Sequence, residues 1–359
     1  MLGKASEDLL ELAVVKESPL YEKLRAGKAR CLVCERRCVL GDGDYGFCGT
    51  RANIGGKVFT LVYGDLSALE SRPIEIKPFF HYYPASSALT FSTWSCNFAC
   101  PWCQNYHLSK VKPSPRTASY IPPEDVVREA LRSGDQGVCV SFNEPTMLFE
   151  YSLDVFELAA KRGLYCCYVS NGYMTDLALK SLLESGLSGL KVDVKGTEEV
   201  YRKYCGVYGA DKVWRNARLA KEAGAHVEVV YLVVNGVNDE LSMVEEVVER
   251  HLKALGPEVP MHFTRYFPAY KFYNPPTPVE KLEQARNLAV EMGVKYAYIG
   301  NVPGHPYENT YCPSCGQLLI RRYSYSVLEY NVTSDNKCPR CGCRIPIYGR
   351  PRIGSRASC

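Results

Sequence analysis

The chain has 359 residues, with 46% hydrophobic residues, 23% charged residues and a formal net charge of +4. These values describe an ordinary soluble globular protein with room for one large domain and small appendages, and the charge is too mild to indicate a nucleic-acid partner by itself. No run of eighteen apolar residues occurs, and the N-terminus lacks the basic-then-apolar order of a secretory signal. We therefore expect a cytoplasmic protein that makes no membrane contact.

The 17 cysteines gather in metal-ligand spacings rather than in the disulfide framework of a small secreted protein. Residues 1–28 precede them and carry helical spacing, which predicts an amphipathic N-terminal helix. Four thiols follow, at Cys31, Cys34, Cys38 and Cys48. Glycines among them allow the tight turns that wrap backbone around a metal. The spacing suits structural zinc, which we prefer, or a fully ligated auxiliary iron–sulfur cluster.

Residues 58–63 are predicted to form a strand, and residues 72–84, rich in aromatics and prolines, an ordered connection. We expect its His81 to be a packing residue, because a histidine in such surroundings is more often satisfied in the core than bound to a ligand. The apolar run at 88–94 then predicts the first strand of a larger sheet.

The loop after this strand carries three thiols, Cys96, Cys100 and Cys103, in C-x3-C-x2-C spacing. Three thiolates hold an iron–sulfur cubane with one iron left without a protein ligand, and an open metal position is where a substrate or cofactor coordinates. A zinc knuckle completed by His107 is the alternative. Because loops at the C-terminal ends of barrel strands are expected places for catalysis, we predict that these cysteines form the catalytic centre.

Short apolar runs then alternate with longer helical patterns. The predicted strands are 138–142, 165–170, 189–194, 226–233, 261–265 and 296–299. The predicted helices are 123–133, 149–162, 175–185, 198–203 with 213–223, 242–255 and 279–292. Strict alternation of this kind indicates a parallel sheet with crossover helices. The predicted fold class is therefore α/β, a partial (β/α)6 barrel, with functional residues where its strands end.

Polar residues do stand at the ends of these strands. They are Asn143, Glu144, Ser170, Asn171, Asp193, Lys195 and His262. One polar residue that closes a strand is commonplace, but four groups in phase with a cysteine loop are hard to explain as solvation. We predict that they line one site with the three cysteines.

Residues 265–273 alternate cations with aromatic rings, as surfaces that bind single-stranded nucleic acid do, although a core strand that continues into a lid would look similar. The last unit pairs the knuckles Cys312-x2-Cys315 and Cys338-x2-Cys341 across a predicted hairpin, which is the pattern of a zinc ribbon. A basic tail, 349–359, ends the chain, and a solvated terminus explains it at least as well as a binding segment does.

The cysteine loop resembles the cluster motif of the radical S-adenosylmethionine (SAM) enzymes. The resemblance implies that Cys96, Cys100 and Cys103 hold a [4Fe-4S] cluster whose electron cleaves SAM to methionine and a 5'-deoxyadenosyl radical. The stretch from Phe142 to Pro145 looks like the family's glycine-glycine-glutamate-proline motif, with Phe142 and Asn143 in place of the glycines. By this likeness Glu144 would accept a hydrogen bond from the SAM ammonium.

If SAM binds at this centre, the other strand-end residues are placed to contact it. Lys195 would pair with the SAM carboxylate as a point charge, and His262 would meet the ribose. Ser170, Asn171 and Asp193 would supply the remaining polar contacts from their strand ends.

The order of motifs from Cys31 to Arg350 resembles the radical SAM protein of the AmmeMemoRadiSam system. This implies C-alkylation of RNA uridine together with Memo-like and AMMECR-like proteins and an electron donor such as ferredoxin. Such proteins are also described as homologues of pyruvate formate-lyase activating enzyme, so a glycyl-radical activase is an alternative. Only Cys139 lies between Cys103 and Glu144, which argues mildly against the activases that carry a ferredoxin-like insert.

A non-catalytic, metal-stabilised binding module is a third reading, which the three-thiol vacancy disfavours. The expected domains are 1–84 with the helix and the four-cysteine metal site, 85–307 with the barrel, 308–348 with the zinc ribbon, and 349–359 with the basic tail.

Overall fold

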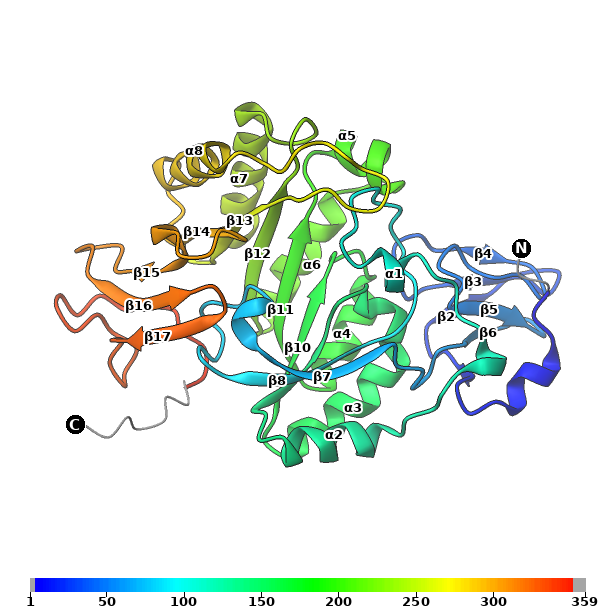
Figure 1. Cartoon of the computed structure of the whole chain (residues 1–359). Helices are drawn as coiled ribbons and strands as arrows, with labels where there is room; N and C mark the ends of the chain where they lie inside the picture. Colours follow the sequence, from blue (N-terminus) through cyan, green and yellow to red (C-terminus); the bar gives the residue numbers. More distant parts are fainter. Residues whose placement is uncertain (1–3, 351–359) are drawn as a thin grey trace.

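The computed structural model describes residues 4–350 and is built around one eight-stranded sheet (Figure 1). The strands follow one another in sequence order across it, from β7 at one edge to β14 at the other. β8 to β14 are parallel, and β7 pairs antiparallel with β8. The strands are β7 (Ala68–Pro73), β8 (Ser87–Ser92), β9 (Gly137–Val140), β10 (Tyr165–Ser170), β11 (Leu187–Val194), β12 (His226–Val233), β13 (Met261–Arg265) and β14 (Ala297–Gly300).

Six crossover helices connect the parallel strands. They are α2 (Pro123–Arg132), α3 (Phe149–Lys161), α4 (Asp176–Glu184), α6 (Asp211–Glu222), α7 (Leu241–Leu255) and α8 (Val279–Glu291). Each packs on the next along the chain, so they form one layer against one face of the sheet. The short helices are η1 (Glu7–Glu11), η2 (Ile74–Ile76), α1 (Tyr106–Ser109), η3 (Pro115–Thr117), η4 (Pro145–Leu148), α5 (Glu198–Val200), η5 (Tyr201–Cys205) and η6 (Pro306–Glu308).

The predicted alternation of strands and helices is confirmed from β8 to β14. β10, β12 and β13 have the predicted bounds, and the other predicted elements of this region differ by one to a few residues. β9 and β10 consist mostly of apolar residues, as is usual in parallel sheets. β11 and β13 also carry polar residues, among them Lys191, Asp193 and His262. Val229 and Phe263, for example, are fully buried.

The sheet is strongly curved. Residues from β8 to β14, among them Thr90, Lys191 and Ile299, line a single cavity on the face that the helices leave open. Seven strands spaced at about 4.8 Å would span about 29 Å if they lay flat. One cavity is lined by both β8 and β14, which are the first and the last of these parallel strands. The sheet must therefore bend around the cavity.

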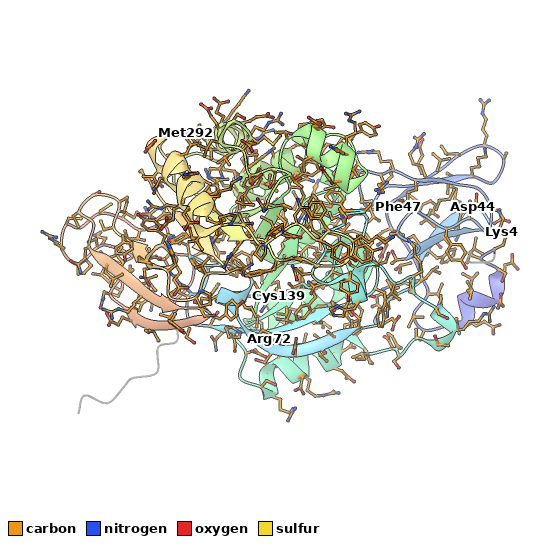
Figure 2. The ribbon with its side chains drawn as sticks, turned by 45° about the horizontal axis from the view of Figure 1, so that its top comes forward. Lys4, Asp44, Phe47, Arg72, Cys139 and Met292 are labelled. Carbon is orange, nitrogen blue, oxygen red and sulfur yellow. The ribbon has the colours of Figure 1, made fainter. Side chains whose placement is uncertain are left out.

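The N-terminal cysteine unit, residues 4–66, lies beside one end of the sheet (Figure 1). It holds two three-stranded sheets made of β1 (Lys16–Glu17), β2 (Tyr21–Lys23), β3 (Ala29–Cys31), β4 (Val39–Leu40), β5 (Arg51–Ile54) and β6 (Lys57–Thr60). Figure 2 places Lys4, Asp44 and Phe47 in it, and Lys4 Nζ lies 2.7 Å from Asp44 Oδ1.

The predicted N-terminal amphipathic helix is wrong beyond its first turns. Among residues 4–28 only the short 3-10 helix η1 forms, and Lys16–Glu17 and Tyr21–Lys23 are strands. The apolar residues of this segment have helical spacing. However, β1 pairs with β6 and β2 pairs with β3, and the hydrogen bonds of these sheets outweigh the local preference for a helix.

The C-terminal cysteine unit, residues 308–348, lies on the opposite side of the central sheet from the N-terminal unit (Figure 1). Its strands β15 (Thr310–Tyr311), β16 (Leu318–Tyr323) and β17 (Ser326–Tyr330) form one antiparallel sheet. Arg322 is 3% exposed and donates to the carbonyl of Phe80 at 2.8 Å and to Thr310 Oγ1 at 2.8 Å. This side chain ties the hairpin to the wall of the central cavity.

Most of the predicted basic tail, including Arg352 and Arg356, lies outside the described residues. Across residues 4–350, the structure contains no helix with the length and apolar character needed to cross a membrane.

Candidate functional site

The cavity on the open face of the sheet has a volume of about 530 Å³, and the three predicted catalytic cysteines line it. Six of the predicted polar residues line the same cavity: Asn143, Glu144, Asn171, Asp193, Lys195 and His262. Ser170 lies just behind the surface, where its hydroxyl donates to Glu144 Oε1 at 2.8 Å. The curvature of the sheet therefore brings together residues from the carboxyl ends of β9, β10 and β11. His262 differs from the prediction, because it is the second residue of β13 and reaches the cavity from the start of that strand rather than from its end.

The cysteine loop is held by contacts on both of its sides. Ser95 takes a left-handed backbone conformation with φ of 71°, which turns the chain out of β8. The amide of Phe98 donates to Cys96 Sγ at 3.3 Å, and Cys103 Sγ lies 3.0 Å from Ser109 Oγ at the end of α1. Thiolates that receive such hydrogen bonds are stabilised in the form that binds metal.

Cys205 lies next to the cysteine loop, although no ligand spacing in the sequence predicts it there. Its sulfur is 3.5 Å from Cys100 Sγ, and hydrogen bonding between them lowers the pKa of Cys100 to about 6. Cys205 is fully buried and does not line the cavity, so it lies behind Cys100. It therefore leaves the open side of the three thiols facing the cavity.

Glu144 joins two strand ends. Its carboxylate accepts hydrogen bonds from the amide and hydroxyl of Thr146, from the hydroxyl of Ser170 and from the amide of Asn171. Burial raises the pKa of Glu144, and these four donors oppose that effect. Three of them reach Oε1 and one reaches Oε2, so Oε2 retains capacity for one further donor from the cavity.

Asparagines connect the loops that follow β8, β9 and β10. Asn143 Nδ2 donates to the carbonyl of Ser95 at 2.9 Å, and Asn105 Nδ2 donates to that of Phe142 at 2.6 Å. Asn171 Nδ2 donates to Asn97 Oδ1 at 2.7 Å. Asn143 and Asn171 thus fix the cysteine loop to its neighbours in addition to lining the cavity.

Phe142 has φ of 68°, in the left-handed region where glycine is usually found. This is one of the two positions at which the sequence departs from the glycines of the motif it resembles. The backbone keeps the conformation that a glycine would adopt, at a cost of order 1 kcal/mol or more for a side chain at such φ.

Three charged residues at alternate positions line the cavity together: Lys191 and Asp193 in β11, and Lys195 directly after it. Lys191 Nζ lies 2.5 Å from Asp193 Oδ1, and Lys195 Nζ lies 3.8 Å from Asp193 Oδ2. Burial opposes the charged form of Lys195, yet Asp193 raises the pKa of this lysine above its ordinary value. Two cations share one anion, so the group carries one surplus positive charge.

Lys191 was missed in the sequence, where only the strand end was considered. Its position two residues before Asp193 on the same strand is a signal that could have found it, because residues i and i+2 face the same side.

His262 lies on the cavity wall with its imidazole held from behind. Its Nε2 is 2.6 Å from Glu228 Oε2, and its ring stacks on Tyr298 at a centroid distance of 5.1 Å. Glu228 is fully buried, and hydrogen bonds with His226 and His262 overcome the burial effect and hold the pKa of Glu228 well below its ordinary value. His81 instead packs in the core, with Nε2 2.6 Å from the Tyr298 hydroxyl, as expected.

The far side of the cavity is formed by residues 72–80 and by the C-terminal hairpin. Arg72 lines it from β7, Glu75 and Lys77 line it from the connection after β7, and Ser324 and Tyr325 line it from the turn between β16 and β17. Figure 2 labels Arg72 on β7 and Cys139 on β9. The three thiols and this basic wall thus bound the same space.

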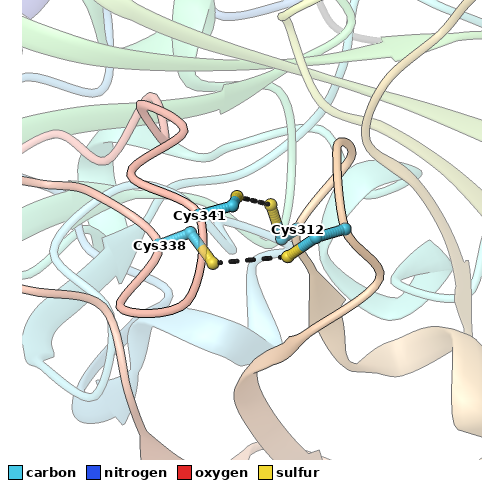
Figure 3. A group of neighbouring side chains, drawn as sticks. Cys312, Cys338 and Cys341 are labelled. Carbon is cyan, nitrogen blue, oxygen red and sulfur yellow. Dashed lines mark hydrogen bonds between the residues drawn. The ribbon is translucent and has the colours of Figure 1, made fainter.

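The cysteine groups differ in their spacing. In the C-terminal unit, Cys312 Sγ lies 3.5 Å from Cys341 Sγ and Cys315 Sγ lies 3.7 Å from Cys338 Sγ (Figure 3). Four thiolates around one zinc ion, with Zn–S bonds of about 2.3 Å, are about 3.8 Å apart. Within residues 4–350 this is the one group whose ligand atoms all lie within 4.8 Å of one another. The thiols of Cys96, Cys100 and Cys103 do not form such a compact group within the described residues.

Comparisons with known proteins agree with this arrangement. The model of the "Radical SAM superfamily" matches residues 92–250. An uncharacterized protein of Methanocaldococcus jannaschii is 39% identical over 335 residues, covering 93% of this chain and 99% of the relative. The chain belongs to the radical SAM superfamily.

Other similarities are weaker. A probable GTP 3',8-cyclase of Thermococcus kodakarensis is 27% identical over 216 residues, which is 58% of this chain and 68% of that protein. Streptococcus suis SuiB bound to S-adenosylmethionine is 13% identical with a TM-score of 0.48, over 62% of this chain and 53% of that one. A radical SAM methyltransferase from Sphaerobacter thermophilus is 16% identical with a TM-score of 0.47, over 66% and 71%.

Membership makes this chain a radical SAM enzyme and implies a [4Fe-4S] cluster and SAM. The residues present fit both groups. Three thiols at one end of a large cavity suit a cubane with one open iron. The surplus positive charge at Lys191, Asp193 and Lys195 suits the SAM carboxylate, and the free capacity of Glu144 Oε2 suits an ammonium.

Proposed function

We propose that this radical SAM enzyme modifies a macromolecule, and specifically that it carries out C-alkylation of RNA uridine with Memo-like and AMMECR-like partner proteins. The observation that carries the enzymatic part is the convergence of Cys96, Cys100 and Cys103 with strand-end polar residues on one cavity of about 530 Å³. That volume falls in the usual range for small-molecule sites. The curved sheet is proposed to be the partial (β/α)6 barrel that the sequence predicted.

Each group of residues has a defined task in this proposal. The bound cluster and SAM supply a one-electron cleavage that yields methionine and the 5'-deoxyadenosyl radical. Cys96, Cys100 and Cys103 hold the cluster, with Cys205 supporting Cys100. Lys195 orients the SAM carboxylate, and the loops tied by asparagines fix the distance between the cluster and the SAM contacts.

The rim of the cavity supports a nucleic-acid substrate. Tyr273 is 79% exposed, and Tyr106 stacks on Tyr270 at a centroid distance of 5.3 Å. Arg265 lies 5.2 Å from the centroid of the partly exposed Phe267 ring. Exposed rings interleaved with cations are the features that bind single-stranded nucleic acid by stacking and charge. Gln104 of the cysteine loop donates to the carbonyl of Phe267, so this surface is continuous with the cavity.

The metal in the C-terminal unit is proposed to be zinc, in a ribbon formed by Cys312, Cys315, Cys338 and Cys341. The sulfur separations of 3.5 and 3.7 Å support this choice because they match a zinc tetrahedron. Such a site stabilises a small unit that lacks a core of sufficient size.

Anaerobic reconstitution with iron, sulfide, SAM and dithionite tests the enzymatic part. We expect methionine and 5'-deoxyadenosine from the wild-type protein and neither from Cys103→Ala, while Cys343→Ala serves as the matched control outside all three cysteine groups. A well-reconstituted wild-type protein that cleaves no SAM would contradict the proposal.

RNA from cells that lack the gene tests the substrate. Incubation with the enzyme, SAM and the two partner proteins should produce a modified uridine, detected by nucleoside mass spectrometry, and omission of either partner should abolish it. SAM cleavage without an RNA product, together with a glycyl radical on a partner enzyme in electron paramagnetic resonance (EPR) spectra, would instead establish an activase.

A further inference from the structure

The four thiols of the N-terminal unit surround a cavity of their own. Its volume is about 20 Å³, and it is lined by Cys31, Cys34, Cys38 and Cys48 together with Val33, Arg36, Gly46, Arg51, Asn97 and Met147. A Cβ added to Gly46 would lie 3.8 Å from Cys48 Sγ and 3.9 Å from Cys38 Sγ. The thiols therefore converge on one enclosed space, with backbone close on one side of it.

This cavity is too wide for a single zinc ion. In residues 4–350, no three of these four thiols have sulfur atoms that all lie within 4.8 Å of one another, unlike the thiols of the C-terminal unit. A cavity of this volume also exceeds the 10–15 Å³, roughly, that one water needs, whereas four sulfurs in a zinc tetrahedron leave no such space between them. The same chain thus contains one compact set of four thiols and one expanded set.

Two buried donors point to an anionic group in the expanded set. Asn97 and Arg51 line the cavity and are 0% and 2% exposed. Asn97 Nδ2 and Arg51 Nε have no hydrogen-bond partner in the part of the chain that the structure describes. A buried donor without an acceptor is costly, and the sulfur atoms of a metal–thiolate cluster are acceptors that would satisfy both.

The N-terminal unit is also joined directly to the catalytic cysteine loop. Ser95 Oγ donates to the carbonyl of Cys48 at 2.5 Å, and Arg36 Nε donates to the carbonyl of Asn97 at 2.5 Å. Through the first bond, standard chain dimensions keep the α-carbons of Cys48 and Cys96 within about 11 Å of each other. Asn97 follows Cys96 and lines the N-terminal cavity, so one residue adjoins both thiol groups.

We propose that Cys31, Cys34, Cys38 and Cys48 hold a second iron–sulfur cluster, which passes single electrons to the cluster at Cys96, Cys100 and Cys103. The electron-transfer step rests on the proposed function of the first cluster. A low-potential one-electron carrier protein reduces the second cluster, which is reoxidised when it reduces the first. One electron enters for each SAM molecule that is cleaved.

Metal analysis of a variant without the catalytic thiols tests the site. In Cys96→Ala/Cys100→Ala/Cys103→Ala, reconstituted anaerobically as the full chain, we expect iron and acid-labile sulfide in equal amounts, with one zinc per chain for the C-terminal unit. Four of each per chain indicates a cubane, and two of each a two-iron cluster. Two zinc ions, or no iron, would overturn the proposal. If this variant does not fold, the wild-type iron content decides, since a total of four iron atoms per chain refutes a second cluster.

EPR spectroscopy tests the placement. The fully reduced wild-type protein should show spectra broadened by interaction between two nearby clusters, and the triple variant should show one unbroadened signal. In the triple-variant background, Asn97→Asp should lower the reduction potential of the remaining cluster, because a carboxylate oxygen replaces the Nδ2 donor. An unchanged potential would contradict the role of Asn97.

These outcomes are distinct from those of the proposed function. A triple variant that retains its iron while the wild-type protein cleaves no SAM would refute the SAM chemistry and leave the second cluster standing.

Discussion

Glu75 gives a test of the electrostatics of the cavity wall. Its carboxyl is 2% exposed and accepts a hydrogen bond from the amide of Ala85 at 2.7 Å. Burial raises the pKa of Glu75 from 4.5 to about 7, against the attraction of Arg322. The folded protein therefore keeps a proton on this carboxyl at pH values where the unfolded chain has released it.

The sign and size of the effect follow from linkage. Because the pKa of Glu75 is higher in the folded state, its contribution to stability is fully present below pH 4.5, where the carboxyl is protonated in both states. The contribution is lost between pH 4.5 and about 7, where only the unfolded chain releases the proton. At about 1.4 kcal/mol per pKa unit, the total loss is about 3 kcal/mol. Glu75→Gln keeps the shape and the acceptor for Ala85 but cannot ionise. Between pH 5 and pH 8, its unfolding free energy relative to wild type should increase by about 2.5 kcal/mol.

Urea denaturation of reconstituted wild type and Glu75→Gln at the two pH values measures this difference. The cysteine sites are the same in both proteins, so their own pH dependence cancels. The exposed Glu249→Gln is the control and should show no comparable change. A difference between wild type and Glu75→Gln that stays constant from pH 5 to pH 8, or that shrinks, would refute the reasoning.

Three further predictions concern the cavity and the C-terminal unit. Lys195→Ala should weaken SAM binding about 10- to 100-fold, as expected for a lost charge-assisted hydrogen bond, in calorimetry against the exposed control Lys203→Ala. Cys205→Ala should retain its iron but be reduced a few-fold more slowly by dithionite, since the sulfur 3.5 Å from Cys100 is gone; an unchanged rate would remove Cys205 from the site. Cys338→Ser should lose one zinc per chain and lower the melting temperature, and retention of zinc would contradict the ribbon.

The central sheet was predictable because short strands rich in apolar residues alternate with amphipathic helices. β12 is an example, since its run from Val229 to Val233 is apolar and bounded by the helical patterns of α6 and α7. The N-terminal helix failed for the opposite reason. Its apolar residues have helical spacing, but partners elsewhere in the chain pair with residues 16–23 as strands, and a local pattern carries no information about such pairing.

Site residues that lie close together in the sequence could be predicted, and contacts between residues far apart in the sequence could not. The cysteine loop and the strand-end residues lie in recognisable order. Cys205 lies 105 positions from Cys100 with no ligand spacing, so only the fold could bring the two sulfurs together. Glu144 also accepts four protein hydrogen bonds that the sequence did not reveal, because the backbone turn after β10 brings Ser170 and Asn171 to its carboxylate. Its Oε2 keeps capacity for one further donor, and the contact with the SAM ammonium stays a prediction.

Arg322 connects the C-terminal unit to the wall of the cavity, because its guanidinium donates to the carbonyl of Phe80. If this unit holds zinc, as proposed, the hairpin that carries Arg322 would depend on that ion. Without that ion, the hairpin would lose the hydrogen bond from Arg322 to Phe80, and Ser324 and Tyr325 would no longer be held at the cavity. Loss of zinc would then lower the activity of an iron-dependent enzyme without changing its iron content.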